Sequence, residues 1–239
     1  MLDTAAPSLA RAWDYLLGGG ASFAADRSLA RRLEALHPGI RESLLSSRTY
    51  AADAVTHVAR AGVDQYLDLG SGLPTRPATH QSARAVLPGA RVAYVDRDPV
   101  VTEHGRGLVP AGVRYVQGEL AEPEAIIASG DLAGIIDLSR PVCLVLTLVH
   151  HVLDPGTARA VTGVLVRALV PGSFLIVTAA QADSGGLPES VWPGGPTPAD
   201  VASFFAGLDL LPPGLHEGTI VGGTGVKPAA VAGTGIGTR

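Results

Sequence analysis

The sequence predicts an α/β protein with a doubly wound, mostly parallel sheet and additional helices before it. Three observations support this fold class. Helical periodicity runs through residues 1–62, five short apolar, β-rich segments follow, and helix-compatible segments separate them. Strands that alternate with helices form parallel sheets covered on both faces, and right-handed crossovers make such a sheet doubly wound.

Residues 1–62 are expected to form a helical cap that belongs to the same domain as the sheet. The first segment, PSLARAWDYLLGGG, places Leu9 and Trp13 on one face and ends at glycines. A second amphipathic segment, AADRSLARRLEALHPG, ends at Pro38. A third, IRESLLSSRTYAADAVTHVARAG, runs to Gly62, which is expected to cap it.

Residues 63–239 are expected to form the core with the sheet, followed by a weak C-terminal tail. The strand candidates are QYLDLG, ARVAYVD, VRYVQG, PVCLVLTLV and GSFLIVTAA, with helix candidates around 78–88, 99–108, 122–130 and 155–170. DSGGLPESVWPGGPTP is expected to be a loop, and TPADVASFFAGLDLLPPG a helix and a short strand. The tail from Gly222 is expected to be a poor edge strand or disordered.

Composition limits the classes of function. A hydrophobic content of 46% in 239 residues is enough for a folded core. The net charge of -4 and the lack of a basic stripe argue against nucleic acid and anionic membranes as partners. Cys143 is the only cysteine, which excludes a disulfide within the chain and disfavours a metal cluster.

The N-terminus lacks the pattern of a signal peptide, and no apolar run is long enough for a transmembrane helix, so we expect a cytoplasmic protein. The sequence does not exclude a homo-oligomer. Lys227 is the only lysine among the 18 basic residues, a bias typical of high-GC coding sequences. Single arginines therefore receive little functional weight from composition alone.

A glycine pair after the first predicted strand indicates a ligand site. In a doubly wound sheet, ligands bind beyond the carboxyl ends of the strands. Glycine there permits a tight turn and brings bare backbone close to a ligand. An ordinary strand-to-helix turn is the alternative, because short Gly-x-Gly matches are frequent by chance. The candidate residues of this turn are Asp68, Gly70, Ser71 and Gly72.

An acidic residue ends the second predicted strand. The Asp96 carboxylate is placed to accept hydrogen bonds from a ribose diol, and Arg97 beside it is a further candidate for the ligand. The alternative role for Asp96 is a helix cap before Pro99. Asp98 fills that role better, because it directly precedes a proline at the first helical position. Asp96 is therefore expected to be free for a ligand.

Glu119 and Leu120 follow the third predicted strand and complete a site for adenosine. Glu119 is placed to accept from an adenine amine and Leu120 to pack on the ring, although a helix start favoured by the macrodipole explains them equally well. The sites occur in the order expected for one adenosine ligand. A dinucleotide needs a third glycine where this chain has Thr75. The pattern therefore favours S-adenosyl-L-methionine, which has no pyrophosphate, over NAD.

Several segments together resemble the S-adenosyl methyltransferase family once catalogued as a domain of unknown function, which is abundant in high-GC bacteria. They include ARAWDYLLGG, FAADRSLA, SSRTYAADAV, GVDQYLDLGSGLPT, ARVAYVDRDPVV and SFFAGLDLLPPGL, within roughly residues 7–215. The resemblance implies a Rossmann-like class I methyltransferase fold with S-adenosylmethionine as the methyl donor. It implies no particular acceptor.

The chain departs from the family pattern at several positions. Glu119 stands where relatives have an Asp, and Ala121 where they place an Arg. TAAQAD replaces a run like SHATAD after the fifth strand, and the tail lacks a Trp-Arg-Pro ending. The segment after TAAQAD is also shorter. This last change bears on the acceptor, because in class I methyltransferases that region commonly shapes the acceptor pocket.

Methyl transfer depends on positioning, and a general base is needed only for an acceptor that keeps its proton. His150 and His151 follow the fourth predicted strand and are candidate bases, and Thr147 is a candidate donor contact. A structural role, with a hydrogen bond to a loop carbonyl, is the alternative for the histidines.

The resemblance also implies roles for the first helices. Tyr15 would cover the donor, backbone at Gly18 would approach it, and Arg27 or Arg48 would bind its carboxylate. The residues alone favour a core aromatic, a helix cap and surface charges instead; the resemblance makes Tyr15, Gly18 and Arg48 candidates.

The sequence therefore predicts an S-adenosylmethionine-dependent methyltransferase that acts on a small-molecule acceptor. The alternatives are a protein that binds the donor without transferring its methyl group and, less favoured, a nicotinamide-dependent oxidoreductase.

Overall fold

The computed structural model describes residues 4–180 and 195–229, so most of the loop expected after the fifth strand lies outside the described residues. The sheet has the order β3-β2-β1-β4-β5-β8-β6, with β7 paired to β8. The five predicted parallel strands are confirmed as neighbours that run in one direction. They are β1 (Gln65–Leu69), β2 (Arg91–Asp96), β3 (Val113–Gln117), β4 (Cys143–Thr147) and β5 (Phe174–Ala180).

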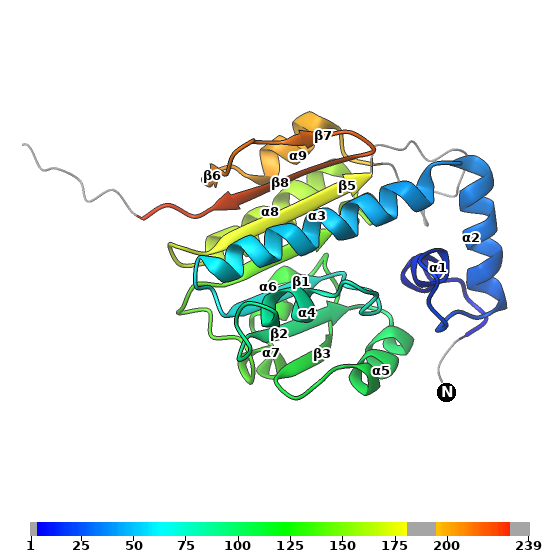
Figure 1. Ribbon diagram of the computed structural model, residues 1–239, viewed down its shortest axis with the longest axis horizontal. Coiled ribbons are helices and arrows are strands. Elements are labelled where there is room, and N and C mark those ends of the chain that lie inside the picture. The colour runs from blue at the N-terminus through cyan, green and yellow to red at the C-terminus, as the bar shows by residue number, and fades with distance from the viewer. Residues whose placement is uncertain (1–3, 181–194, 230–239) are drawn as a thin grey trace, which may run out of the picture.

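Helices cover both faces of the sheet, as the alternating pattern predicts (Figure 1). Apolar side chains of α3, α4 and α5 form the core on one face, and those of α6, α7, α8 and α9 form the core on the other. The bounds are α3 (Ile40–Arg60), α4 (Thr79–Arg84), α5 (Pro99–Leu108), α6 (Pro123–Ile127), α7 (Gly130–Ala133), α8 (Pro155–Ala168) and α9 (Pro198–Phe204).

Two N-terminal helices, α1 (Leu9–Leu16) and α2 (Ala24–Leu36), lie beyond the carboxyl ends of the parallel strands (Figure 1). Together with the start of α3 they form a third apolar cluster, separate from the two on the faces of the sheet. Leu16 of α1, Leu33 of α2 and Leu44 of α3 are buried in it. The amphipathic periodicity of the first segments therefore serves packing of the helices against one another.

The helix and short strand expected around residues 197–214 are confirmed as α9 and β6, but the start of the tail from Gly222 is neither an edge strand nor disordered. β8 (Ile220–Val226) lies inside the sheet, antiparallel to β5 on one side and to β6 (Asp209–Leu210) and β7 (His216–Glu217) on the other. The sequence misleads here because β8 contains glycines, which have low strand propensity. A β-carbon at Gly223 would lie 3.0 Å from the Phe205 ring, so the glycine permits close packing.

Strand register places the carboxyl ends of the parallel strands at one edge. Leu69 of β1 pairs with Val95 of β2, and Asp96 pairs with Gln117 of β3. The loops that follow these strands therefore meet where a doubly wound sheet binds its ligand. Among the described residues, no helix is both long and apolar enough to cross a lipid bilayer.

Candidate functional site

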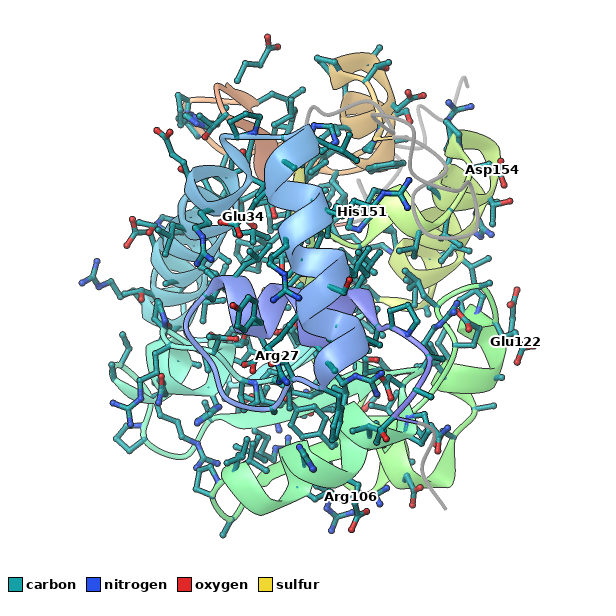
Figure 2. All side chains as sticks on the ribbon, turned by 90° about the vertical axis from the view of Figure 1, so that its right-hand side faces the viewer. Arg27, Glu34, Arg106, Glu122, His151 and Asp154 are labelled. Carbon is teal, nitrogen blue, oxygen red and sulfur yellow. The ribbon has the colours of Figure 1, made fainter. Side chains whose placement is uncertain are left out.

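A cavity of about 390 Å³ lies at this carboxyl edge. Its walls come from the loops after β1, β2, β3 and β4, and the other sides come from the N-terminal segment and from α1, α2 and α3. Figure 2, viewed from the side of α1 and α2, shows both helices in front of the sheet. Ten of the predicted site residues line the cavity: Arg48, Gly70, Ser71, Gly72, Asp96, Arg97, Glu119, Leu120, Thr147 and His151.

The turn after β1 requires glycine at two positions, for different reasons. Gly70 has φ +63°, and a β-carbon there would lie 2.2 Å from Cγ2 of Val149, so the protein itself excludes a side chain. Gly72 has φ +58°, and its nearest neighbour would be Ala10 at 3.6 Å. Because Gly72 lines the cavity, the space in front of it belongs to the site.

Asp96 is held in place by backbone. One carboxylate oxygen accepts from the Gly72 N–H at 2.8 Å, and the other accepts from the Asp98 N–H at 2.9 Å. The expectation that Asp96 is free was therefore incomplete. A carboxylate has about four acceptor sites, so two remain. Burial raises the pKa of Asp96 to about 6. The cap role of Asp98 is confirmed, since its side chain accepts from the Val100 N–H at 2.9 Å.

The residues after β3 form the rim of the cavity. Leu120 is buried and contacts the apolar core below it, whereas Glu119 is half-exposed. The Glu119 carboxylate pairs with the Arg97 guanidinium at 3.4 Å. This pair connects the loop after β2 with the loop after β3. As an exposed pair it contributes little to stability.

The two histidines after β4 have different surroundings. His150 does not line the cavity: its Nε2 lies 3.0 Å from the Thr162 hydroxyl, and its ring stacks on Phe204 with 4.2 Å between centroids. The geometry is that of the structural alternative, with a hydroxyl partner in place of a loop carbonyl. His151 lines the cavity, and its ring meets Trp13 edge-on at 6.0 Å.

Burial lowers the pKa of His151 to about 4 and that of His150 to about 3. Both imidazoles are therefore neutral at pH 7. A base role for His151 stays a prediction.

Other predicted residues lie outside the cavity lining. Tyr15 packs against the cluster of N-terminal helices, and Gly18 ends α1 with φ +83°. Arg27 donates to the Ser22 carbonyl. Asp68 is buried, accepts from the Thr79 hydroxyl at 2.6 Å, and has a pKa that burial raises to about 6. For Tyr15 and Gly18, these places match the alternatives that the residues alone favour.

Arg11 lines the cavity, although sequence reasoning did not single it out. Its side chain is almost fully buried. Nε contacts the Asp26 carboxylate at 3.0 Å, Nη1 contacts that of Asp98 at 3.3 Å, and Nη2 donates to the Ala6 carbonyl at 2.6 Å. The only available signal was an arginine between the apolar residues of an amphipathic helix, and composition gave single arginines no weight.

Comparison with known proteins identifies the group to which this fold and cavity correspond. A family model described as S-adenosyl methyltransferase matches residues 1–223. A candidate methyltransferase from Thermobifida fusca, known from a crystal structure, is 35% identical with a TM-score of 0.86, over 95% of this chain and 97% of that chain. A DUF574 family protein from Streptomyces avermitilis is 29% identical with a TM-score of 0.87, over 95% and 100%.

More distant structures agree in fold. The N-methyltransferase NodS from Bradyrhizobium japonicum, in complex with S-adenosyl-L-homocysteine, is 12% identical with a TM-score of 0.56, over 92% of this chain and 100% of that chain. This likeness shows the class I fold. None of the curated proteins matches the chain.

Proposed function

Because the chain belongs to the S-adenosyl methyltransferase family and depends on S-adenosylmethionine, we propose that its acceptor is a small molecule bound in the cavity beside the donor. The observation that carries the proposal is the position of the cavity between the strand ends and the N-terminal helices. Residues of α1, α2 and α3 line it opposite the strand ends and cover part of the site, which favours a small acceptor over a large polymer. The net charge of -4 also disfavours a polyanionic acceptor.

The lining residues suit the donor, which supplies a methyl group on a sulfonium when bound. Asp96 has two acceptor positions left for ribose hydroxyls. Leu120 offers an apolar surface to the adenine, with Glu119 beside it. Bare backbone at Gly72 lines the cavity and lets a ligand approach closely, as at a cofactor cradle.

Arg48 is the group that we assign to the donor carboxylate. It lines the cavity and, among the described residues, forms no ion pair within 4.0 Å; its positive charge acts on the buried Asp68 and lowers the pKa of that carboxyl in part. A guanidinium suits a carboxylate because it can donate two parallel hydrogen bonds. Thr147, at the end of β4, also lines the cavity, and we assign it to the amino-acid end of the donor.

Two measurements test this proposal in sequence. Calorimetry with S-adenosylmethionine, S-adenosylhomocysteine and NAD should give binding of the first two and much weaker binding of NAD. Release of S-adenosylhomocysteine should then appear with a low-molecular-mass cell fraction, and not with purified DNA, RNA or protein fractions. Turnover that occurs only with a polymer fraction would contradict the small-molecule acceptor while leaving donor binding intact.

A further inference from the structure

Part of the cavity is lined by apolar side chains from four different segments. We call this set the apolar compartment; it consists of Leu9, Trp13, Leu17, Leu29, Leu44 and Leu148. Leu44 is a buried member of the third apolar cluster, which is separate from the clusters on the two faces of the sheet. The other five are only partly buried and pack against that cluster. Apolar surface left facing a cavity gains free energy when an apolar ligand covers it.

The charged residues of the cavity lining lie outside this compartment. Arg11 pairs with two carboxylates, Arg97 pairs with Glu119, and Asp96 is held by backbone. Arg48 lies one helical turn after Leu44 on α3, and in the proposed function its guanidinium is occupied by the donor carboxylate. With the donor bound, a charged ligand in the compartment would therefore lose its hydration without gaining an ionic partner, which disfavours its binding.

One polar side chain adjoins the compartment. His151 lines the same cavity, and its ring meets the ring of Trp13, a member of the compartment. The indole of Trp13 favours a flat aromatic neighbour, because aromatic rings pack edge-to-face or offset. The compartment also contains Leu148, which follows β4 directly and has φ +52°, an uncommon value for a leucine that is typical of functional sites.

We propose that the apolar compartment binds the acceptor and selects an uncharged aromatic molecule that carries a hydroxyl group, with His151 accepting a hydrogen bond from that hydroxyl. This inference rests on the proposed function, because it places the acceptor beside the donor. In the reaction, a bond forms between the acceptor oxygen and the methyl carbon while the carbon–sulfur bond breaks. Sulfur keeps the electron pair of that bond, and the hydroxyl proton passes by way of His151 to water.

The electrostatics of His151 fit this role. Its pKa, lowered by burial to about 4, keeps the imidazole neutral at pH 7. A neutral imidazole accepts a hydrogen bond without repelling a sulfonium, whereas an imidazolium would disfavour a nearby positive charge. The proton becomes strongly acidic as the oxygen is methylated, so a weak base suffices to accept it.

The experiment compares two probes that differ by one charge. 2-Naphthol has an aromatic ring system and a hydroxyl, and 6-hydroxy-2-naphthoate adds a carboxylate to them. Calorimetry on the protein saturated with S-adenosylhomocysteine should give 2-naphthol at least tenfold tighter binding than the carboxylate. Equal or tighter binding of the carboxylate overturns the inference, and so does failure of the protein to bind either probe.

A charge placed in the compartment should reverse this preference. Leu29→Lys should weaken 2-naphthol binding at least tenfold and bring the carboxylate to equal or higher affinity. Leu45→Lys makes the same change at an exposed site on α3 outside the cavity lining and should leave both affinities unchanged. If Leu29→Lys fails to fold, the wild-type comparison still decides.

Titration with S-adenosylmethionine alone separates the two levels of the account. If the protein binds the donor but does not prefer 2-naphthol, only the role of the apolar compartment is overturned. If it does not bind the donor, the proposed function itself is overturned.

Discussion

Asp96 illustrates how one side chain can organise a turn and still serve a ligand. Its carboxylate joins the turn after β1 to the turn after β2 through the N–H groups of Gly72 and Asp98. Burial makes its charge costly, and the raised pKa expresses that cost. A ligand that donates hydroxyl hydrogen bonds would stabilise the charged form. The cost of burying the Asp96 charge therefore falls at a position where donor binding would reduce it.

Replacing Asp96 tests this double role. Asp96→Ala should weaken donor binding by about 1.5–3 kcal/mol, the range for hydrogen bonds to a charged group. It should also lower the melting temperature, because two buried N–H groups lose their acceptor. Asp64→Ala is the control, since Asp64 precedes β1 at the opposite edge and pairs with Arg140. Calorimetry showing normal donor affinity in Asp96→Ala would move the ribose elsewhere.

The same carboxyl group predicts a pH dependence of donor affinity. Ribose hydroxyls donate to a carboxylate, so wild-type affinity should fall as pH drops below about 6, by roughly tenfold per pH unit. Calorimetry between pH 5 and 8 should show this decline in the wild type and a flat profile in Asp96→Asn. A wild-type profile without the decline would separate Asp96 from the donor.

The stability of the ligand-free protein should have the opposite pH dependence: it should fall as pH rises. The pKa values of Asp96 and Asp68 rise from 3.8 to about 6 on folding, so the folded chain holds these protons more tightly than the unfolded chain. Their contribution to the free energy of unfolding is full below pH about 4 and is lost as pH rises through 6. Donor binding is thus expected to stabilise the protein most above pH 6.

Gly72 offers a test of the turn itself. Gly72→Val places a stiff side chain at positive φ and fills the space in front of the turn, so donor affinity should fall sharply. Gly207→Val is the control for backbone strain, because Gly207 also has positive φ but does not line the cavity; a β-carbon at Gly207 would meet nothing within 4 Å, whereas one at Gly72 would contact Ala10. Melting curves and titrations of both variants should show a similar loss of stability and a loss of affinity only for Gly72→Val. Equal affinities would reduce the turn to a structural one.

At the scale of elements, α1 is tied to the sheet through one buried side chain. Arg11 of α1 reaches Asp26 in the first turn of α2 and Asp98 at the start of α5. The Asp98 N–H in turn holds Asp96. The covering helices and the expected ribose contact are thus connected through three residues. The orientation of α1 should therefore affect donor binding without direct contact between Arg11 and the reacting atoms.

Arg11→Met should break this connection. Removal of one partner from a buried ion pair costs about 3–5 kcal/mol, because the other charge stays buried. We expect a lower melting temperature and faster dissociation of S-adenosylhomocysteine, measured by stopped flow well below the melting point. Arg31→Met, an exposed substitution of the same kind on α2, is the control. Unchanged dissociation in Arg11→Met would make Arg11 a purely structural residue.

The sequence predicted the elements well where periodicity decided them. The five parallel strands have alternation or buried apolar runs, and α1, α2 and α3 have amphipathic stripes. Prediction failed where tertiary contacts override propensity. The glycines of β8 read as a tail, yet they allow Phe205 to pack on the sheet. Arg11 was given no functional weight, because the carboxylates that pair with it lie 15 and 87 residues away along the chain.

For the whole molecule, the site is an assembly of chain segments far apart in sequence. Strand ends supply polar groups for the donor, and the N-terminal helices supply the opposite, apolar side. Strand order made the first half predictable, since ligands bind at the carboxyl edge. The apolar side of the cavity depends on how α1 and α2 pack over that edge, and local sequence patterns do not predict this packing. Ten predicted residues line the cavity and four do not. Tyr15 and Gly18 come from the N-terminal helices, whereas Asp68 and His150 come from the strand half of the site and contact Thr79 and Thr162 instead.

The central claim is that the donor occupies this cavity, and a crystal structure of the protein with S-adenosylhomocysteine tests it most directly. The account predicts ribose hydroxyls on the Asp96 carboxylate, the adenine against Leu120 and the amino-acid carboxylate on Arg48, with the sulfur facing the apolar compartment. Electron density for the ligand outside the cavity, or with its adenosine and amino-acid ends reversed, would contradict the account.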